Sequence, residues 1–151
     1  MTVDRGSSAD IELLMDHRKR LWEEVGSRSA EAIERVLPAY REWLIQGLSE
    51  GSILSFIARR EGIVLGSGCL WIRHAHPKPS LSKFVEAYLM AMYTEPDYRR
   101  IKVASTIVQS AIDACRELGI ERINLHASEA GMKVYEKMGF TYTTEMRLKL
   151  V

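Results

Sequence analysis

Residues 85–118 constrain the fold of this chain more than any other segment. Residues 85–94 are mostly apolar and predict a strand that is buried on both faces. A turn containing Pro96 follows, and residues 103–118 then repeat apolar side chains at helical spacing. A further strand is expected at 123–126, and such a strand–helix–strand unit implies a parallel pair joined by a right-handed crossover. The segment therefore predicts a mixed α/β domain.

The rest of the chain alternates between helical and strand patterns. Gly26 to Ser29 break the apolar periodicity between two amphipathic helices, and Pro38 is expected to kink or split the second of them. Apolar side chains alternate over 142–150 and predict a last strand that closes the sheet. The other expected strands lie at 1–5, 52–60 and 63–74, and the other expected helices lie at about 8–25, 30–48 and 130–138.

The composition is that of an ordinary globular domain. The chain has 151 residues, 46% of them hydrophobic and 27% charged, with a net charge of +1. That length suits one hydrophobic core, so we expect a single domain over 1–151, with a mostly antiparallel sheet flanked by helices. The near-neutral charge favours neither a nucleic acid nor a membrane as partner. The first residues lack the apolar core of a signal peptide, so we expect a cytoplasmic protein.

The cysteines and histidines give no sign of a metal or redox site. Cys69 and Cys115 are isolated in sequence, without the spacing of a zinc or dithiol motif, and are expected to be buried free thiols. His74 and His76 flank a proline-containing turn, whereas the other two histidines lie far away in sequence. We therefore expect no metal.

The turn after the strand at 85–94 has the features of an anion site. A helix that begins near Val103 leaves its first amides without intrahelical partners and carries partial positive charge there. Arg99, Arg100 and Lys102 add full positive charges around these amides. An anionic cofactor is the expected ligand, although an ordinary helix start without a ligand remains an alternative.

A second segment, Ser128 to Phe140, places Tyr135 on a short helix that Gly139 can end. Together the two segments resemble the GNAT acetyltransferase family, and the similarity is close from Leu89 to Phe140. The resemblance implies an acetyl-CoA cosubstrate whose pantetheine arm lies along a strand and whose pyrophosphate lies on a helix start. The residues that it implies for the cofactor are Met92, Tyr93, Thr94, Arg99, Arg100, Ile101, Lys102, Val103, Ala104, Ser105 and Ser128.

The chain departs from the family pattern at Lys102, which stands where the first motif glycine is expected, whereas Ala104 keeps the second small position. A Lys102 side chain that points inward would block the pocket. We expect it to point outward, because Arg99 and Ala104 keep the spacing of the family and a right-handed helix start does not require glycine. The Lys102 amide would then still donate to phosphate. The Met92 amide is our candidate for polarising the thioester carbonyl, because a bulge in a strand exposes such donors.

Acetyl transfer also needs a proton donor and, unless bulk water suffices, a base. Tyr135 is the candidate acid for the departing thiolate, with a core aromatic as the alternative. Ile123 stands where some relatives carry a catalytic glutamate. Glu86 is our first candidate base, because a carboxylate on an apolar strand needs a cavity or a partner; an ion pair is the alternative. The further candidate bases are His126 and Glu129, and Tyr88 could order a water molecule for proton removal.

The sequence thus predicts an acetyl-CoA-dependent N-acetyltransferase acting by direct attack in a ternary complex, with a small-molecule or peptide amine as acceptor. Tyr40, Trp43, Trp71 and the loop at 74–83 are expected around the acceptor, or else are core and surface loop. A non-catalytic acyl-CoA-binding domain is the alternative function. A P-loop nucleotide enzyme is not supported, because the chain lacks that glycine-rich motif. The C-terminal strand leaves a homodimer open.

Overall fold

Five strands form one sheet, and their order in the sheet is their order along the chain. The computed structural model describes residues 1–26 and 28–151. Neighbouring strands are antiparallel, except that the fourth and fifth are parallel. This confirms the predicted mixed sheet with one parallel pair. The strands are β1 (Thr2–Arg5), β2 (Ile53–Arg60), β3 (Ile63–His74), β4 (Val85–Thr94) and β5 (Ile123–Leu125).

The helices begin and end largely where side-chain caps and glycines lie. Ser29 and Ser128 each accept a hydrogen bond from a backbone amide in the first turn of the helix that follows. The second helix is not split at Pro38. The predicted break before it includes Ser27, which lies outside the described residues. The helices are α1 (Ile11–Val25), α2 (Ala30–Glu50), α3 (Val103–Glu117) and α4 (Glu129–Lys137), with 3₁₀ turns η1 (Ser8–Asp10) and η2 (Pro96–Tyr98).

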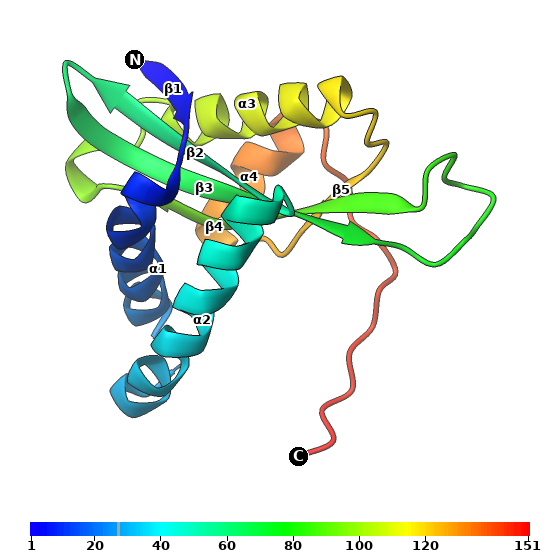
Figure 1. Ribbon diagram of the computed structural model, residues 1–151, viewed down its shortest axis with the longest axis horizontal. Coiled ribbons are helices and arrows are strands. Elements are labelled where there is room, and N and C mark those ends of the chain that lie inside the picture. Colours follow the sequence, from blue (N-terminus) through cyan, green and yellow to red (C-terminus); the bar gives the residue numbers. More distant parts are fainter. Residues whose placement is uncertain (27) are drawn as a thin grey trace.

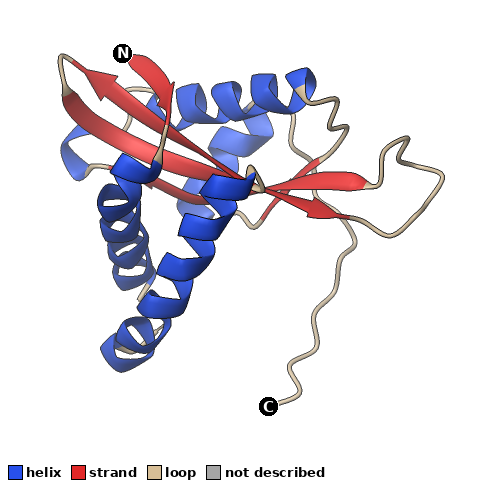
Figure 2. Ribbon diagram, in the orientation of Figure 1, coloured by secondary structure: helices blue, strands red, loops and turns tan. Residues whose placement is uncertain are grey.

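The helices cover both faces of the sheet, with α1 and α2 on one face and α3 on the other (Figure 1, Figure 2). Adjacent side chains of β3 show this division, because successive residues of a strand point to opposite faces. Cys69 packs with Leu14 of α1 and Leu44 of α2, whereas Leu70 packs in the larger core with Ile107 of α3. The apolar breadth of α3 therefore serves its packing on the sheet, as its sequence predicted.

The predicted last strand is wrong for the isolated chain. Residues 141–151 form no strand and are exposed throughout, and the segment runs away from the helices (Figure 1). Met146, Leu148 and Leu150 are 94%, 81% and 86% exposed. An alternating pattern makes a strand only where a neighbouring strand supplies hydrogen bonds. In this chain the outer edge of β5 receives no such neighbour from the described residues.

Candidate functional site

The parallel strands β4 and β5 pair over only three residues, from Ala87 to Leu89 of β4. From Met90 onward the backbone of β4 has no partner in β5, so the sheet opens there. On the other side, Ala91 and Met92 stand opposite Gly68 of β3, where the antiparallel register shifts and Ala91 takes a positive φ of 54°. A bulge therefore lies where the sequence expected one, and Met92 is part of it.

The loop between β4 and α3 leaves several backbone amides without internal acceptors. The first hydrogen bond of α3 runs from Thr106 N to Lys102 O at 3.0 Å. The amides of Val103, Ala104 and Ser105 come before this first bond, so they have no carbonyl acceptor within α3. They also lie at the positive end of the helix dipole. The structure therefore brings together the backbone of the predicted phosphate cradle.

Lys102 does not start a right-handed turn, so that part of the sequence argument is wrong. Its φ is 68° and its ψ is 17°, in the left-handed region that glycine adopts most easily. The glycine expected at this position has a conformational reason, because the chain must turn left-handed immediately before α3. Arg100 shares this conformation with φ 69°. Both residues are exposed.

Arg99 is held by an acidic partner from another element. Its Nη2 donates to both carboxylate oxygens of Glu24 in α1, at 2.9 and 2.8 Å, and its Nε donates to Thr94 O at 3.1 Å. The hydroxyl of Tyr93 also donates to Glu24, at 3.1 Å. The Arg99 charge is therefore shared with a carboxylate, which leaves Arg100 and Lys102 as the cations of this loop without such a partner among the described residues.

A buried polar network, which the sequence analysis missed, lies beside this loop. His17 of α1 is 1% exposed; its Nδ1 lies 2.7 Å from Ser67 Oγ and its Nε2 lies 3.1 Å from Glu95 Oε1. Arg20 donates to both oxygens of Glu95 at 2.8 Å. Burial lowers the pKa of His17, and hydrogen bonds from Arg20 lower the pKa of Glu95. The network fixes α1 to the start of the loop between β4 and α3.

Glu86 lies on the face of the sheet that α1 and α2 cover, at its end near β5. Its carboxylate accepts from Arg73 Nε and from Asn124 Nδ2, both at 3.2 Å, and its side chain is 14% exposed. This is the ion pair that the sequence analysis named as the alternative. Six residues of β4 separate Glu86 from Met92, which is roughly 20 Å along a strand. The structure does not bring these two predicted groups together.

Tyr135 of α4 is half-buried and packs against the core beside α3. Its ring lies edge-on to Phe140 with centroids 5.7 Å apart, and burial raises the pKa of its phenol. It lines a groove of about 820 Å³ between α3, β5, α4 and the start of the tail. Ser128 Oγ accepts from Gly131 N at 3.2 Å, so it caps α4.

Aromatic rings from four elements form a row on the α1 and α2 side of the sheet. Ring centroids along this row are 5.5 to 6.5 Å apart, and all five rings are half-buried. Tyr40, Trp43 and Trp71, which the sequence placed near the acceptor, do lie together. The row consists of Trp22, Tyr40, Trp43, Trp71 and Tyr88.

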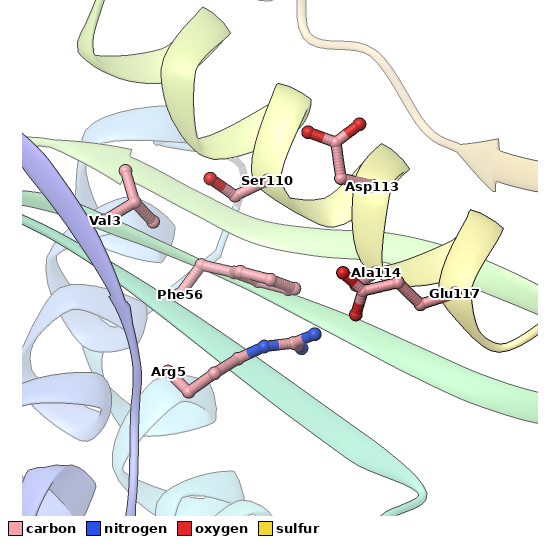
Figure 3. Close-up of a pocket in the computed structure, with 7 residues that line it drawn as sticks. All are labelled: Val3, Arg5, Phe56, Ser110, Asp113, Ala114 and Glu117. Carbon is pink, nitrogen blue, oxygen red and sulfur yellow. The ribbon is translucent and has the colours of Figure 1, made fainter.

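A smaller cavity of about 240 Å³ lies between β1, β2 and α3, away from the predicted residues (Figure 3). Arg5 lies 4.6 Å above the ring of Phe56, and Asp113 and Glu117 project from α3 at its rim. It is far from the first turn of α3, and none of the residues predicted from the sequence lines it. In the described part of the chain, no group of three His, Cys, Asp or Glu side chains is placed to hold a metal ion. No helix there is long and apolar enough to cross a membrane.

Comparison with known proteins points to one family. The sequence model of the acetyltransferase (GNAT) family matches residues 12–140. A GCN5-related N-acetyltransferase from Ralstonia eutropha JMP134 is 27% identical, with a TM-score of 0.91 over 99% of this chain and 97% of that chain. A predicted acetyltransferase from Clostridium acetobutylicum, solved with acetyl-CoA, is 25% identical, with a TM-score of 0.89 over 99% and 96%.

A more distant structure shows the same fold. The aminoglycoside antibiotic 6'-N-acetyltransferase from Acinetobacter haemolyticus is 18% identical, with a TM-score of 0.75 over 99% of this chain and 97% of that chain. Among curated proteins none matches. The fold predicted from the sequence and the family that it resembles are both confirmed.

Proposed function

Because the chain belongs to the acetyltransferase (GNAT) family, we propose that it transfers the acetyl group of acetyl-CoA to a primary amine by direct attack in a ternary complex. The observation that carries this proposal is the opening between β4 and β5, which is followed at once by the free amides of α3. A strand edge and a helix start in this order suit a long cofactor that ends in phosphates. A relative of similar fold is solved with acetyl-CoA.

The cofactor would lie along the open edge of β4. In this proposal the backbone of Met92, Tyr93 and Thr94 holds the pantetheine arm, and the bulge at Met92 presents its amide to the thioester carbonyl. A backbone donor aimed at the developing oxyanion stabilises the tetrahedral intermediate. Ser128, at the start of α4, would face the arm from the other side. The amides that would hold the pyrophosphate are those of Arg100, Ile101, Lys102, Val103, Ala104 and Ser105.

Direct attack by the amine is supported by the state of the two cysteines. Cys69 and Cys115 are both buried, as the sequence predicted. Burial raises the pKa of the Cys69 thiol to about 12 and that of Cys115 to about 11. Only a thiolate accepts an acyl group readily, so neither thiol is suited to carry the acetyl group.

The proton transfers are assigned to Tyr135 and Glu86. Burial keeps the Tyr135 phenol protonated, as an acid for the leaving thiolate must be. Glu86 is the base in this proposal, although its separation from Met92 requires a relay of water molecules past Tyr88. Its support is the half-buried carboxylate on the face with the aromatic row. In this proposal the amine nitrogen forms the new bond to the acetyl carbon, the C–S bond breaks, and the amine proton passes to Glu86. Tyr135 protonates the departing thiolate, so that coenzyme A leaves as the free thiol.

We further propose that the protein is a homodimer in which the tail of one copy pairs with the other copy. The outer edge of β5 lies beside the groove lined by α3 and α4. The exposed alternating side chains of 142–150 match an added strand, since one set would enter the groove and the other would face water. Within the described residues, β5 has an open edge and the tail has a strand-like alternation without a neighbouring strand, and this combination favours exchange between copies.

Calorimetric titration of the purified protein with acetyl-CoA, free coenzyme A and ATP tests the cofactor without knowledge of the acceptor. We expect micromolar binding of acetyl-CoA and coenzyme A and no binding of ATP. Binding without acetyl transfer to any amine in a broad screen would instead support the acyl-CoA-binding domain as the function. Absence of binding to either cofactor would contradict both proposals.

A further inference from the structure

Arg18 of α1 is a cation without an acidic partner in the part of the chain that the structure describes. Its Nε is buried and has no hydrogen-bond partner among residues 1–26 and 28–151. Its guanidinium lies 4.4 Å above the ring of Trp22 and 5.6 Å above that of Tyr40. The aromatic faces attract the cation but accept no strong hydrogen bonds from it. The donors of Arg18 are therefore only partly satisfied by the protein.

Other arginines of the same region show the contrast. Arg20, two residues further along α1, forms a two-bond pair with Glu95, and Arg99 pairs with Glu24. Arg73, above Trp71 and Tyr88, pairs with Glu86. Arg18 forms no such pair within the described residues. The side chains that influence its charge most are Tyr40, Cys69 and Tyr88, and none of them is a carboxylate.

Leaving such a group unpaired is energetically unfavourable. Desolvation lowers the pKa of Arg18, which shows that its surroundings oppose the charge. Arg18 as a whole is half-buried, but its Nε–H has been removed from water, and a polar group in that state is ordinarily hydrogen-bonded. A ligand carboxylate would supply the missing acceptors in the bidentate geometry that guanidinium favours.

The aromatic rings beside Arg18 indicate what else such a ligand carries. Trp22 and Tyr40 continue into the aromatic row, whose last pair, Trp71 and Tyr88, stands directly opposite each other on β3 and β4. Each ring is half-buried and so keeps some surface accessible. β4 is also the strand whose bulge would hold the thioester. A molecule at Arg18 thus lies on an apolar surface that leads toward the cofactor strand.

We propose that the amine acceptor also carries a carboxylate, as an amino acid with an apolar side chain does, and that Arg18 binds this carboxylate. This inference rests on the proposed acetyltransferase function and names its substrate class. A polycationic aminoglycoside is disfavoured, because it would bring further positive charge to an arginine that already lacks a counter-ion. The row of aromatic rings suits the apolar side chain of the acceptor.

The three tryptophans of the chain, Trp22, Trp43 and Trp71, all lie in this row, so intrinsic fluorescence reports binding there without turnover. The probes are the N-acetyl derivatives of glycine, leucine and phenylalanine, which mimic the product, each compared with its C-terminal amide. The amides keep the shape and lose the charge. We expect at least one acid to bind about 30-fold more tightly than its amide, as a charged hydrogen-bonded pair should.

Variants assign this preference to Arg18. Arg18→Met should reduce the ratio of acid to amide affinity to about one, whereas Arg18→Lys should keep part of it, because the charge stays and the planar fork is lost. Arg35→Met, an exposed arginine on α2, is the matched control and should keep the wild-type ratio. Should Arg18→Met fail to fold, the wild-type ratio and the Arg18→Lys ratio still decide.

Two results separate failure of this inference from failure of the proposed function. If acetyl-CoA binds by calorimetry but acids and amides bind alike in the wild type, Arg18 is a packing residue and the inference is wrong. An Arg18→Met protein that keeps the full acid preference would also overturn it. If acetyl-CoA does not bind, the acetyltransferase proposal fails, whatever the acids do.

Discussion

Nε2 of His17 lies 3.1 Å from Oε1 of Glu95, although 78 residues separate them in the sequence. Because the Glu95 carboxylate accepts, Nε2 carries the proton and Nδ1 accepts from the hydroxyl of Ser67 at 2.7 Å. In this arrangement both ring nitrogens of the neutral imidazole have a hydrogen-bond partner. It ties α1, which carries Arg18 and the first rings of the aromatic row, to the loop that would hold the cofactor.

The His17 network makes stability depend on pH in a defined window. Burial lowers the pKa of His17 in the folded state, so the unfolded chain takes up the proton first. The free energy of unfolding is therefore unaffected by His17 above its unfolded pKa of about 6.5 and falls as the pH decreases below it. Urea unfolding at pH 7.5 and 5.5 should show this loss, and His17→Gln should lose less over that interval. The pKa of Glu95 is lowered in the folded state, so its contribution to the free energy of unfolding is lost only as the pH falls below about 4.5, outside this interval. An equal loss in both proteins would remove His17 as the cause.

Replacing Lys102 by glycine, the residue that the family pattern has at this position, should stabilise the protein. The Lys102 φ of 68° costs a side-chain-bearing residue about 1–2 kcal/mol, partly offset by the greater flexibility of glycine in the unfolded chain. Lys102→Gly is expected to stabilise the protein by about 0.5–1 kcal/mol in thermal unfolding. Lys102→Val, whose branched side chain tolerates this conformation worse, is the matched comparison and should destabilise it. The reverse order would mean that the Lys102 side chain contributes contacts that its backbone geometry does not reveal.

Tyr135→Phe removes the proposed acid and keeps the ring. Because the ring packs on Phe140 and the core, we expect an unchanged fold and unchanged coenzyme A affinity by calorimetry. Turnover should fall at least about tenfold, as loss of a general acid does. Tyr142→Phe, an exposed tyrosine of the tail, is the control. Wild-type turnover in Tyr135→Phe would leave Tyr135 as a packing residue.

Glu86→Gln tests the proposed base against its structural alternative. The substitution removes the carboxylate and weakens the pair with Arg73, whereas Arg73→Met breaks the same pair and keeps the carboxylate. With an amine found by the screen, we expect Glu86→Gln to lower kcat/KM about tenfold or more. Arg73→Met should keep most of the wild-type kcat/KM, because the proposed base is still present. An equal loss of kcat/KM in both variants would assign Glu86 to structure alone.

The tail should decide the oligomeric state. Light scattering on a sizing column is expected to give a dimer for the whole chain and a monomer after deletion of residues 142–151. Leu148→Asp should also give a monomer, because it places a charge on the set of side chains proposed to enter the groove. Lys149→Gln, on the alternate face, is the matched control and should remain a dimer. A monomeric wild type at all concentrations would contradict the exchange.

Local patterns located most of the fold and the loop that precedes α3. The apolar run of β4, the periodicity of α3 and the serine that caps α4 depend on residues close in sequence, so their elements could be predicted. The buried polar network of His17 and the unpaired Nε of Arg18 were not predicted, because they depend on residues distant in sequence. His17 and Arg18 interrupt the apolar stripe of α1 between Leu14 and Leu21, a signal that was present but has no meaning without the partners from β3, β4 and α2.

The sequence by itself determined the order of elements, the position of the helix start after β4 and the family, because short-range backbone preferences encode these. Tertiary structure alone decided the pairing of Arg99 with Glu24 and the burial of Arg18 Nε without an acceptor among the described residues. It also decided that the alternating tail forms no strand within its own chain. Each of these depends on which distant groups meet, since a charge or a strand is stabilised only by a partner that folding brings to it.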